Sequence, residues 1–156
     1  MKYNEFEENN LLFLQKLNIP YATVRLTDNI LKHSIFDANS DIRNFLFNQD
    51  LHDFEKQGFG QEYKVFLKTH ILTFKQSVET KTSLYRAGAR GDYRMWFGSG
   101  ILSLSSPNDL FVITSINKEL YTINLSKIDL ELCHTSSYIN PIKEMFAKFF
   151  NWTISR

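Results

Sequence analysis

A change of hydrophobic period near the middle of the chain constrains the fold more than any other feature of the sequence. From Val65 to Ile71, every second residue is apolar or β-branched, and Lys64, Lys68 and His70 fall on the opposite side. Successive side chains of a strand point to opposite faces, so this pattern predicts a strand with one buried face. We therefore expect a sheet at the centre of the molecule, with basic side chains gathered on one of its faces.

Further strands and three helices are expected around this central segment. The chain contains 14 Phe and 7 Tyr, residue types that favour sheets. Apolar patterning and turn residues predict additional strands at residues 21–26, 82–85, 94–97, 110–115 and 120–125, with a polar turn at 27–29. Helices are predicted from Asn4 to before Pro20, after Ser40, and from Pro141 to about Asn151.

Length and composition predict one domain that spans residues 1–156. No repeat, low-complexity tract or linker divides the chain. It has no apolar run near the roughly 20 residues of a membrane span, and it opens with acidic residues instead of a basic signal segment. We therefore expect a cytoplasmic protein with no membrane partner. One cysteine and four scattered histidines show no ligand spacing, so neither a metal site nor a cofactor is expected.

Positive charge is concentrated in the middle of the chain, although the net charge is only +1. Residues 1–61 contain six Lys and Arg against nine Asp and Glu, residues 62–97 contain seven against three, and residues 98–156 contain five of each. The middle segment therefore has a net charge of +4. Such a local excess attracts phosphate backbones even when the whole molecule is nearly neutral. A solvated strand face that happens to contain lysines would give the same count.

Residues 85–97, with the sequence YRAGARGDYRMWF, are the most informative stretch for function. Arg86, Arg90 and Arg94 surround two glycines and lead into an aromatic strand. Glycine permits tight backbone geometry, and the arginine fork matches guanine or phosphate oxygens. Asp92 can orient a guanidinium or accept a hydrogen bond from cytosine. An Arg–Asp ion pair that only stabilises a hairpin is the alternative explanation, and the two roles can coexist.

This stretch resembles the DNA-binding module of modification-dependent and LlaJI-type, McrB-like restriction subunits, which is related to the EcoRII N-terminal domain. The resemblance covers most of the chain by strand order, but only residues 85–97 by recognisable motif. It implies an α+β, B3-like fold, a sheet-dominated, seven-stranded open pseudobarrel with flanking helices. In that family two loops, an N-arm and a C-arm, embrace the DNA major groove.

The resemblance also implies which residues contact DNA. The C-arm would contain the base-recognition residues Arg86, Arg90, Asp92, Tyr93 and Arg94. Related sequences often have proline where Tyr93 stands here, and this departure bears on the shape of the loop. The N-arm would follow the first strand, so that Arg25, Lys32 and His33 are matched to it by order along the chain.

These observations together predict a sequence-specific domain for double-stranded DNA that has no enzymatic activity. Lysines contact phosphates and position a protein without specifying sequence. We expect this role for Lys64, Lys68, Lys75 and Lys81. The chain has no GxxxxGK[ST] phosphate loop, so the resemblance makes it the N-terminal targeting module of a larger protein. Its further partners would be the motor and nuclease parts of a restriction complex.

Two other functions fit parts of the sequence. Glu62 and Lys64 form an ExK pair with Asp50 and Asp53 upstream, as in a Mg²⁺-dependent PD-(D/E)xK nuclease. In that alternative, two carboxylates would hold the metal and the lysine would position the attacking water. A protein-interaction domain that docks through Phe- and Tyr-rich strands or through the terminal helix would explain the aromatic residues, but not the clustered arginines.

Overall fold

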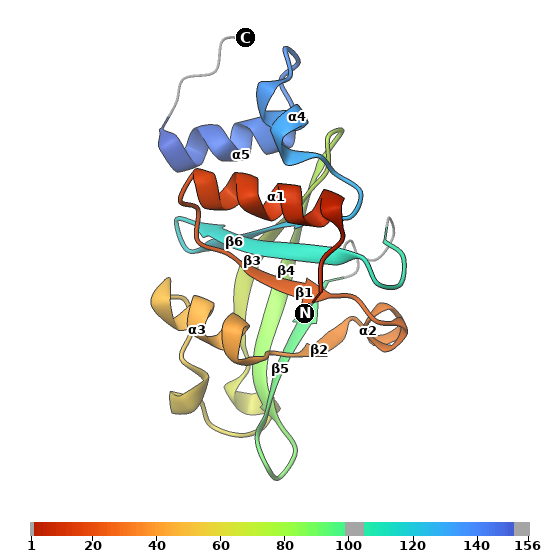
Figure 1. Ribbon diagram of the computed structural model, residues 1–156. Coiled ribbons are helices and arrows are strands. Elements are labelled where there is room, and N and C mark those ends of the chain that lie inside the picture. Colours follow the sequence, from red (N-terminus) through yellow and green to blue (C-terminus); the bar gives the residue numbers. More distant parts are fainter. Residues whose placement is uncertain (1, 99–104, 152–156) are drawn as a thin grey trace.

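One strongly curled mixed sheet organises the protein, as a computed structural model of the chain shows (Figure 1). The structure describes residues 2–98 and 105–151. Within them, seven strands run in the order β1-β6-β7-β3-β4-β5-β2, and β3 pairs with β7 in parallel. The strands are β1 Ala22–Arg25, β2 Ile35–Asp37, β3 Val65–Leu72, β4 Ser77–Ala87, β5 Asp92–Phe97, β6 Leu110–Ile116 and β7 Glu119–Asn124.

Helices flank this sheet on both of its faces. They are α1 Glu5–Lys16, α2 Asp28–His33, α3 Ser40–Asn48, α4 Leu130–Thr135 and α5 Pro141–Phe150, with short 3-10 helices η1 Phe54–Lys56 and η2 Gln61–Tyr63. Helices α1, α4 and α5 gather at one end of the molecule, and the β4–β5 hairpin projects at the opposite end (Figure 1). No helix in the described ranges is long and apolar enough to cross a membrane.

The sheet is an open half-barrel whose two edge strands are β1 and β2. These strands follow each other in the chain, and the segment between them, residues 26–34, contains α2. Side chains of both edge strands line one shared hollow of about 350 Å³. The opening of the half-barrel therefore lies beside α2.

Two hydrophobic cores hold the layers together. The first fills the inside of the curl, where α3 packs with Ile42 and Leu46 against strand residues such as Leu84 and Met95. The second lies on the outer face of β6 and β7, where Phe146 of α5 is fully buried together with residues of α1 and α4. The outer face of the β3–β4–β5 part of the sheet has exposed side chains, including Phe66 and Trp96.

The expected α+β pseudobarrel with seven strands and flanking helices is confirmed. The capping box of Asn4 and Glu7 starts α1, and Asn140 with Pro141 starts α5, as the sequence predicts. The polar turn expected at residues 27–29 is wrong, because Thr27 caps the short helix α2 instead. Strand β2 and helix α4 also went unpredicted; they span three and six residues, too few to show a hydrophobic period.

Candidate nucleic-acid interface

The β4–β5 hairpin ends in a tight four-residue turn, because Ala87 pairs with Asp92 across it. Gly88 and Gly91 adopt positive φ angles of 69° and 68°, which residues with side chains rarely adopt. A Cβ atom on Gly91 would clash with the ring of Phe59, whereas a Cβ atom on Gly88 would face open space. The second glycine therefore also lets the segment before β3 pack against the hairpin.

Arg86 is buried inside the base of the hairpin, with 8% of its surface exposed. Its Nε donates to the Gly91 carbonyl at 2.5 Å, and one terminal nitrogen donates to the Phe54 carbonyl at 2.8 Å. The guanidinium lies over the rings of Phe59 and Tyr93, at 4.7 Å and 4.4 Å from their centroids. The sequence suggested a base-contacting residue here, but in the structure Arg86 holds the frame of the loop.

Two guanidinium groups contact the ring of Tyr93. Arg43 of α3 stacks on its ring at 4.1 Å from the centroid, and Arg86 stacks at 4.4 Å. The Tyr93 hydroxyl donates to Glu55 at 2.5 Å, and this hydrogen bond to a carboxylate raises the pKa of the phenol. The hairpin is thereby fixed against α3 and η1, which reduces the entropy lost when it meets a ligand.

Arg90 and Arg94 face the outside of the hairpin. Arg90 is in the turn, with 88% of its side chain exposed and one loose contact, 3.8 Å, to Asp92. Arg94 lies between two carboxylates, at 3.1 Å from Asp37 and 3.3 Å from Asp92. The Asp37 contact involves Nε without an aligned hydrogen bond, so it is an ion pair only. These contacts orient Arg94 and leave its fork half-exposed.

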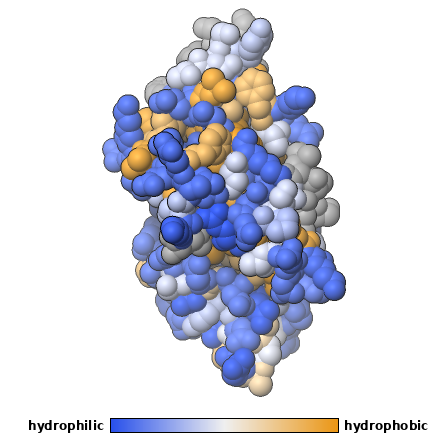
Figure 2. All heavy atoms as spheres, turned by 45° about the vertical axis from the view of Figure 1, so that its right-hand side comes forward, coloured by the Kyte–Doolittle hydropathy of each residue, from blue (hydrophilic) through white to orange (hydrophobic). Residues whose placement is uncertain are grey.

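A groove of about 420 Å³ brings these groups together. Four arginines and two aspartates line it, with Asn39 at the start of α3; the charged residues are Asp37, Arg43, Arg86, Arg90, Asp92 and Arg94. The hollow beside α2 shares Asp37, Asn39 and Arg94 with this groove. The hairpin and the α2 segment therefore flank one continuous surface with Arg94 between them. The face turned toward the viewer in Figure 2 is mainly hydrophilic in its lower half, which ends in the hairpin.

Arg43 is the member of the groove that sequence reasoning missed. It lies on α3, far from the arginine-rich segment in sequence, and its terminal nitrogen donates to the Ala38 carbonyl at 2.6 Å. One weak signal was present, because Arg43 has no acidic residue three or four positions away on its helix. An arginine without a local partner is available for a contact made by the tertiary fold.

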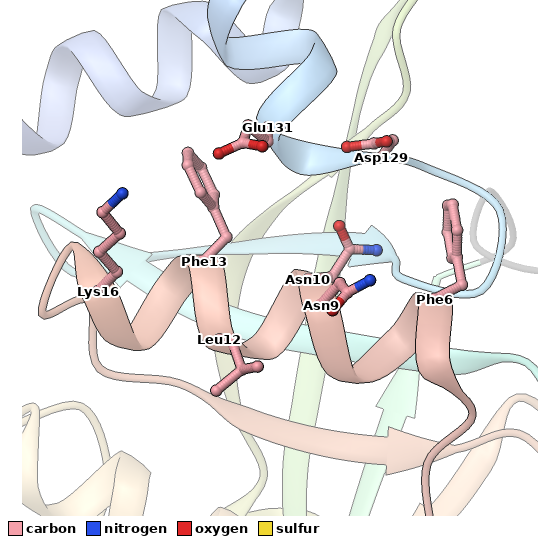
Figure 3. Close-up of a pocket in the computed structure, with 8 residues that line it drawn as sticks. All are labelled: Phe6, Asn9, Asn10, Leu12, Phe13, Lys16, Asp129 and Glu131. Atoms are coloured by element: carbon pink, nitrogen blue, oxygen red, sulfur yellow. The ribbon is translucent and has the colours of Figure 1, made fainter.

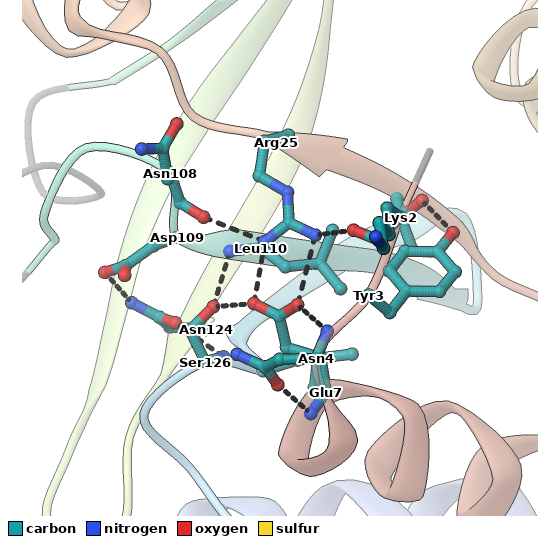
Figure 4. Close-up of polar contacts among 12 residues, drawn as sticks. Lys2, Tyr3, Asn4, Glu7, Arg25, Asn108, Asp109, Leu110, Asn124 and Ser126 are labelled. Atoms are coloured by element: carbon teal, nitrogen blue, oxygen red, sulfur yellow. Dashed lines mark hydrogen bonds and ion pairs between the residues drawn. The ribbon is translucent and has the colours of Figure 1, made fainter.

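The residues expected in the second arm divide into two groups. Arg25 makes a paired salt bridge with the buried Glu7, with nitrogen–oxygen distances of 2.7 Å and 3.0 Å (Figure 4). It also donates to the carbonyls of Lys2 and Asn108. These contacts within the protein occupy the Arg25 guanidinium, whereas the sequence predicted that Arg25 would contact DNA. Lys32 and His33 are exposed in the last turn of α2, beside the opening of the half-barrel.

The four lysines expected at phosphates do not form one group. Lys64 extends over the Tyr85 ring at 5.0 Å, close to the base of the hairpin. Lys68 pairs with Glu79 and Glu119 at 3.2 Å and 3.8 Å, and Lys81 lies over Phe66 at 5.1 Å. Lys75 is in the β3–β4 turn at the other end of the 11-residue strand β4, roughly 35 Å from the hairpin turn. A ligand held by the hairpin is therefore within reach of Lys64 and out of reach of Lys75.

The acidic residues of the nuclease alternative have other partners. Asp50 forms an ion pair with Lys118 at 2.9 Å, and Asp53 accepts from the Glu55 backbone at the start of η1. Within the described ranges, no group of three or more His, Cys, Asp or Glu residues could hold a metal ion. The geometry therefore gives this alternative no metal-binding cluster.

A second type of hollow lies between α1 and α4, with a volume of about 350 Å³ (Figure 3). Its lining combines Phe6 and Phe13 with Lys16, Asp129 and Glu131. The amide of Asn10 at its centre donates to the carbonyls of Leu125 and Ile128 and accepts from the Leu130 backbone. The central polar group thus ties α1 to the segment before α4 and is not available to a ligand.

Comparison with known proteins adds no relative. No family model matches the chain, and no curated protein or solved structure matches it either. The interface is therefore argued from its own geometry.

Proposed function

We propose that this chain is a sequence-specific binding domain for double-stranded DNA with no catalytic activity of its own. The observation that supports the proposal most is a groove at a projecting hairpin, where Arg90 and Arg94 lie beside Asp37 and Asp92 and keep part of their guanidinium groups exposed. Arginine is the residue type best suited to the forked recognition of guanine and phosphate, and aspartate accepts from cytosine. The fixed position of Tyr93 supplies the rigidity that such recognition needs.

The dimensions of the hairpin suit the major groove of DNA. That groove is about 12 Å wide and admits a two-stranded β-ribbon. In the proposed complex the β4–β5 ribbon enters the groove, with Arg90 at its tip and Arg94 on its side. The segment with α2 forms the second arm, where Lys32 and His33 approach the phosphates. Lys64 contacts the DNA phosphate backbone from the foot of the hairpin. Asp92 keeps or gives up its ion pairs with Arg90 and Arg94, depending on which DNA base these arginines contact.

Within a cell, such a domain would direct a larger assembly to its site. The resemblance of residues 85–97 to restriction subunits makes the motor and nuclease parts of a restriction complex its proposed partners. The cytoplasm is the proposed location, because the proposed restriction complex would act on DNA there. We propose no cofactor and no metal for the binding step.

Selection of bound duplexes from a random DNA library tests this function directly. The expected result is an enriched motif containing guanine at the positions that Arg90 and Arg94 contact. The double variant Arg90→Ala/Arg94→Ala should enrich no motif while it remains folded, because the Arg90 side chain is almost fully exposed and that of Arg94 is only partly buried. Failure of the unaltered domain to enrich any duplex would refute the proposal.

The protein-interaction alternative makes a different prediction for the same domain. Exposed apolar residues, among them Leu132 and Tyr138, are present in and beyond α4, remote from the hairpin. Binding that depends on these residues and is insensitive to salt would favour a protein partner, since phosphate contacts weaken steeply with salt. Cleavage of a plasmid that requires Mg²⁺ and is lost in Glu62→Ala would instead favour the nuclease.

A further inference from the structure

The outer face of β3, β4 and β5 has a row of aromatic side chains that the proposed duplex contact does not use. Phe66 is paired across β3–β4 with Ser83, and Ser83 is paired across β4–β5 with Trp96. The three residues therefore form one row on the same side of the sheet. Phe66 is 54% exposed and Trp96 is 37% exposed, whereas Ser83 between them is buried. Two large rings thus stand about 10 Å apart across the sheet.

Cationic side chains border this aromatic row. Lys81 reaches over the Phe66 ring at 5.1 Å, and Lys64 reaches over the neighbouring Tyr85 ring at 5.0 Å. Both lysines lack an acidic partner at ion-pair distance in the described part of the chain, where Glu79 and Glu119 pair with Lys68 instead. We call Phe66, Ser83, Trp96, Lys64 and Lys81 the β3–β5 platform. It combines flat apolar rings with positive charge.

We propose that the β3–β5 platform binds single-stranded DNA by stacking unpaired bases on Phe66 and Trp96. Aromatic rings beside cations suit a ligand that has both flat π faces and negative charge, as a nucleotide does. Bases in a duplex are stacked on each other, so their faces are available only in a single strand. The lysines then contact the phosphates that flank each stacked base. The platform shares Lys64 with the proposed duplex contact, but Phe66 and Trp96 are not part of the lining of the arginine groove, so base stacking on them does not depend on the duplex-binding function.

Fluorescence of Trp96 reports on the platform directly. The chain has two tryptophans, so Trp152→Phe leaves Trp96 as the single tryptophan, whose emission is excited selectively above the tyrosine absorption. Titration of this variant with an oligothymidine should quench its emission, because a base stacks on the indole. An abasic strand of equal length keeps the phosphates and removes the bases, so it should bind more weakly and leave the emission unchanged. An oligouridine arm shows whether RNA binds in the same way.

Substitutions at Phe66 separate stacking from general apolar contact. Phe66→Ala and Phe66→Leu should each weaken oligothymidine binding roughly tenfold, in the range of one lost stacked base, and Phe66→Trp should preserve it. Phe47→Ala, which removes an equally exposed ring on α3, is the matched control and should bind as the unaltered domain does. Phe66→Ala should leave blunt-duplex affinity unchanged, whereas Arg90→Ala should weaken duplex binding and leave oligothymidine binding unchanged.

Three results would overturn the proposal. They are an unchanged Trp96 emission with every strand, an abasic strand that binds as tightly as oligothymidine, and a Phe66→Leu variant that binds as well as the unaltered domain. The last result would mean that the rings form an apolar docking face for a protein. Each can occur whether or not duplex binding succeeds, so the two functions are tested independently.

Discussion

The three arginines of the hairpin differ in how the protein holds them. Arg86 is buried and donates to two carbonyls, Arg94 is half-exposed between two carboxylates, and Arg90 is almost fully exposed. A buried guanidinium that satisfies carbonyls and covers aromatic rings contributes to stability, and an exposed one does not. The same residue type therefore serves the fold at one position and recognition at the others.

Alanine substitutions should separate these roles. Arg86→Ala should lower the free energy of unfolding by about 2–4 kcal/mol, since it leaves the Gly91 and Phe54 carbonyls unpaired and uncovers two rings. Arg90→Ala should leave stability within about 0.5 kcal/mol of the unaltered protein.

On a preferred duplex, Arg90→Ala and Arg94→Ala should each lose about 1–3 kcal/mol of discrimination against random DNA. Denaturant unfolding measures the change in stability, and competition titrations measure the change in discrimination. An equal loss of affinity for the preferred and for the random duplex would show that Arg90 and Arg94 contact phosphates only.

The ion pair of Glu7 and Arg25 is expected to make stability depend on acidity. Burial raises the pKa of Glu7, but hydrogen bonds from Arg25, Ser126 and the Asn4 backbone outweigh burial and lower the pKa below its ordinary value of 4.5 (Figure 4). The folded protein therefore gains stability from this carboxylate at pH values above about 4.5, and loses it as the pH falls through the lowered pKa.

Substitution of either partner should reveal this contribution. Arg25→Ala should lower the free energy of unfolding by about 3–5 kcal/mol at neutral pH, because it leaves a buried carboxylate without its cation. Glu7→Gln should flatten the dependence of stability on pH between about 5 and 3. Glu8→Gln, an exposed acid of the same helix, is the control and should retain that dependence. Thermal unfolding across this pH range measures the effect, and an unchanged profile in Glu7→Gln would contradict the assignment.

At the scale of elements, sequence periodicity located the long strands and helices but missed the contacts that build the site. Residues 65–72 and 141–150 show clear periods and caps, so their structures followed from the sequence. Arg25 and Arg86 looked like DNA contacts because their partners, Glu7 and the Phe54 carbonyl, are 18 and 32 positions away in sequence. No local pattern shows that a guanidinium is already occupied by a distant group. For the same reason Arg43 was overlooked, since only the tertiary fold brings it onto Tyr93.

The two glycines of the hairpin turn should respond differently to the same substitution. Both have left-handed backbone angles, so alanine at either position costs about 1 kcal/mol of strain. Gly91→Ala also forces its Cβ against the Phe59 ring, whereas Gly88→Ala meets open space. We expect Gly91→Ala to lose at least about 1 kcal/mol more stability than Gly88→Ala and to weaken duplex binding, because Arg86 donates to the Gly91 carbonyl. Denaturant unfolding compares the stability of the two variants, and adding Phe59→Ala should restore part of the stability that Gly91→Ala loses. Equal losses of stability at both glycines would show that the Phe59 ring moves aside at no energetic cost.

At the scale of the whole molecule, charge and shape together orient the protein on DNA. The segment with a net charge of +4 extends along β3, β4 and β5, but its cations lie at different distances from the hairpin. Lys64 is near the base of the hairpin, and Lys75 is roughly 35 Å from its tip at the far end of β4. A duplex that meets the hairpin end therefore gains counterion release from only part of the basic segment.

Salt dependence should measure this selective contact. Each phosphate that a protein cation neutralises adds about 0.9 to the negative slope of log affinity against log salt concentration. If Lys32 and Lys64 each neutralise one phosphate, the slope for a short duplex should be about −2. Lys64→Ala should reduce its magnitude by about 1 and weaken all duplexes alike, and Lys75→Ala should leave it unchanged although both variants remove one positive charge. Fluorescence polarisation between about 50 and 200 mM salt gives both slopes. Equal slopes for Lys64→Ala and Lys75→Ala would show that DNA binding depends on the net charge of the protein and not on cations close to the hairpin.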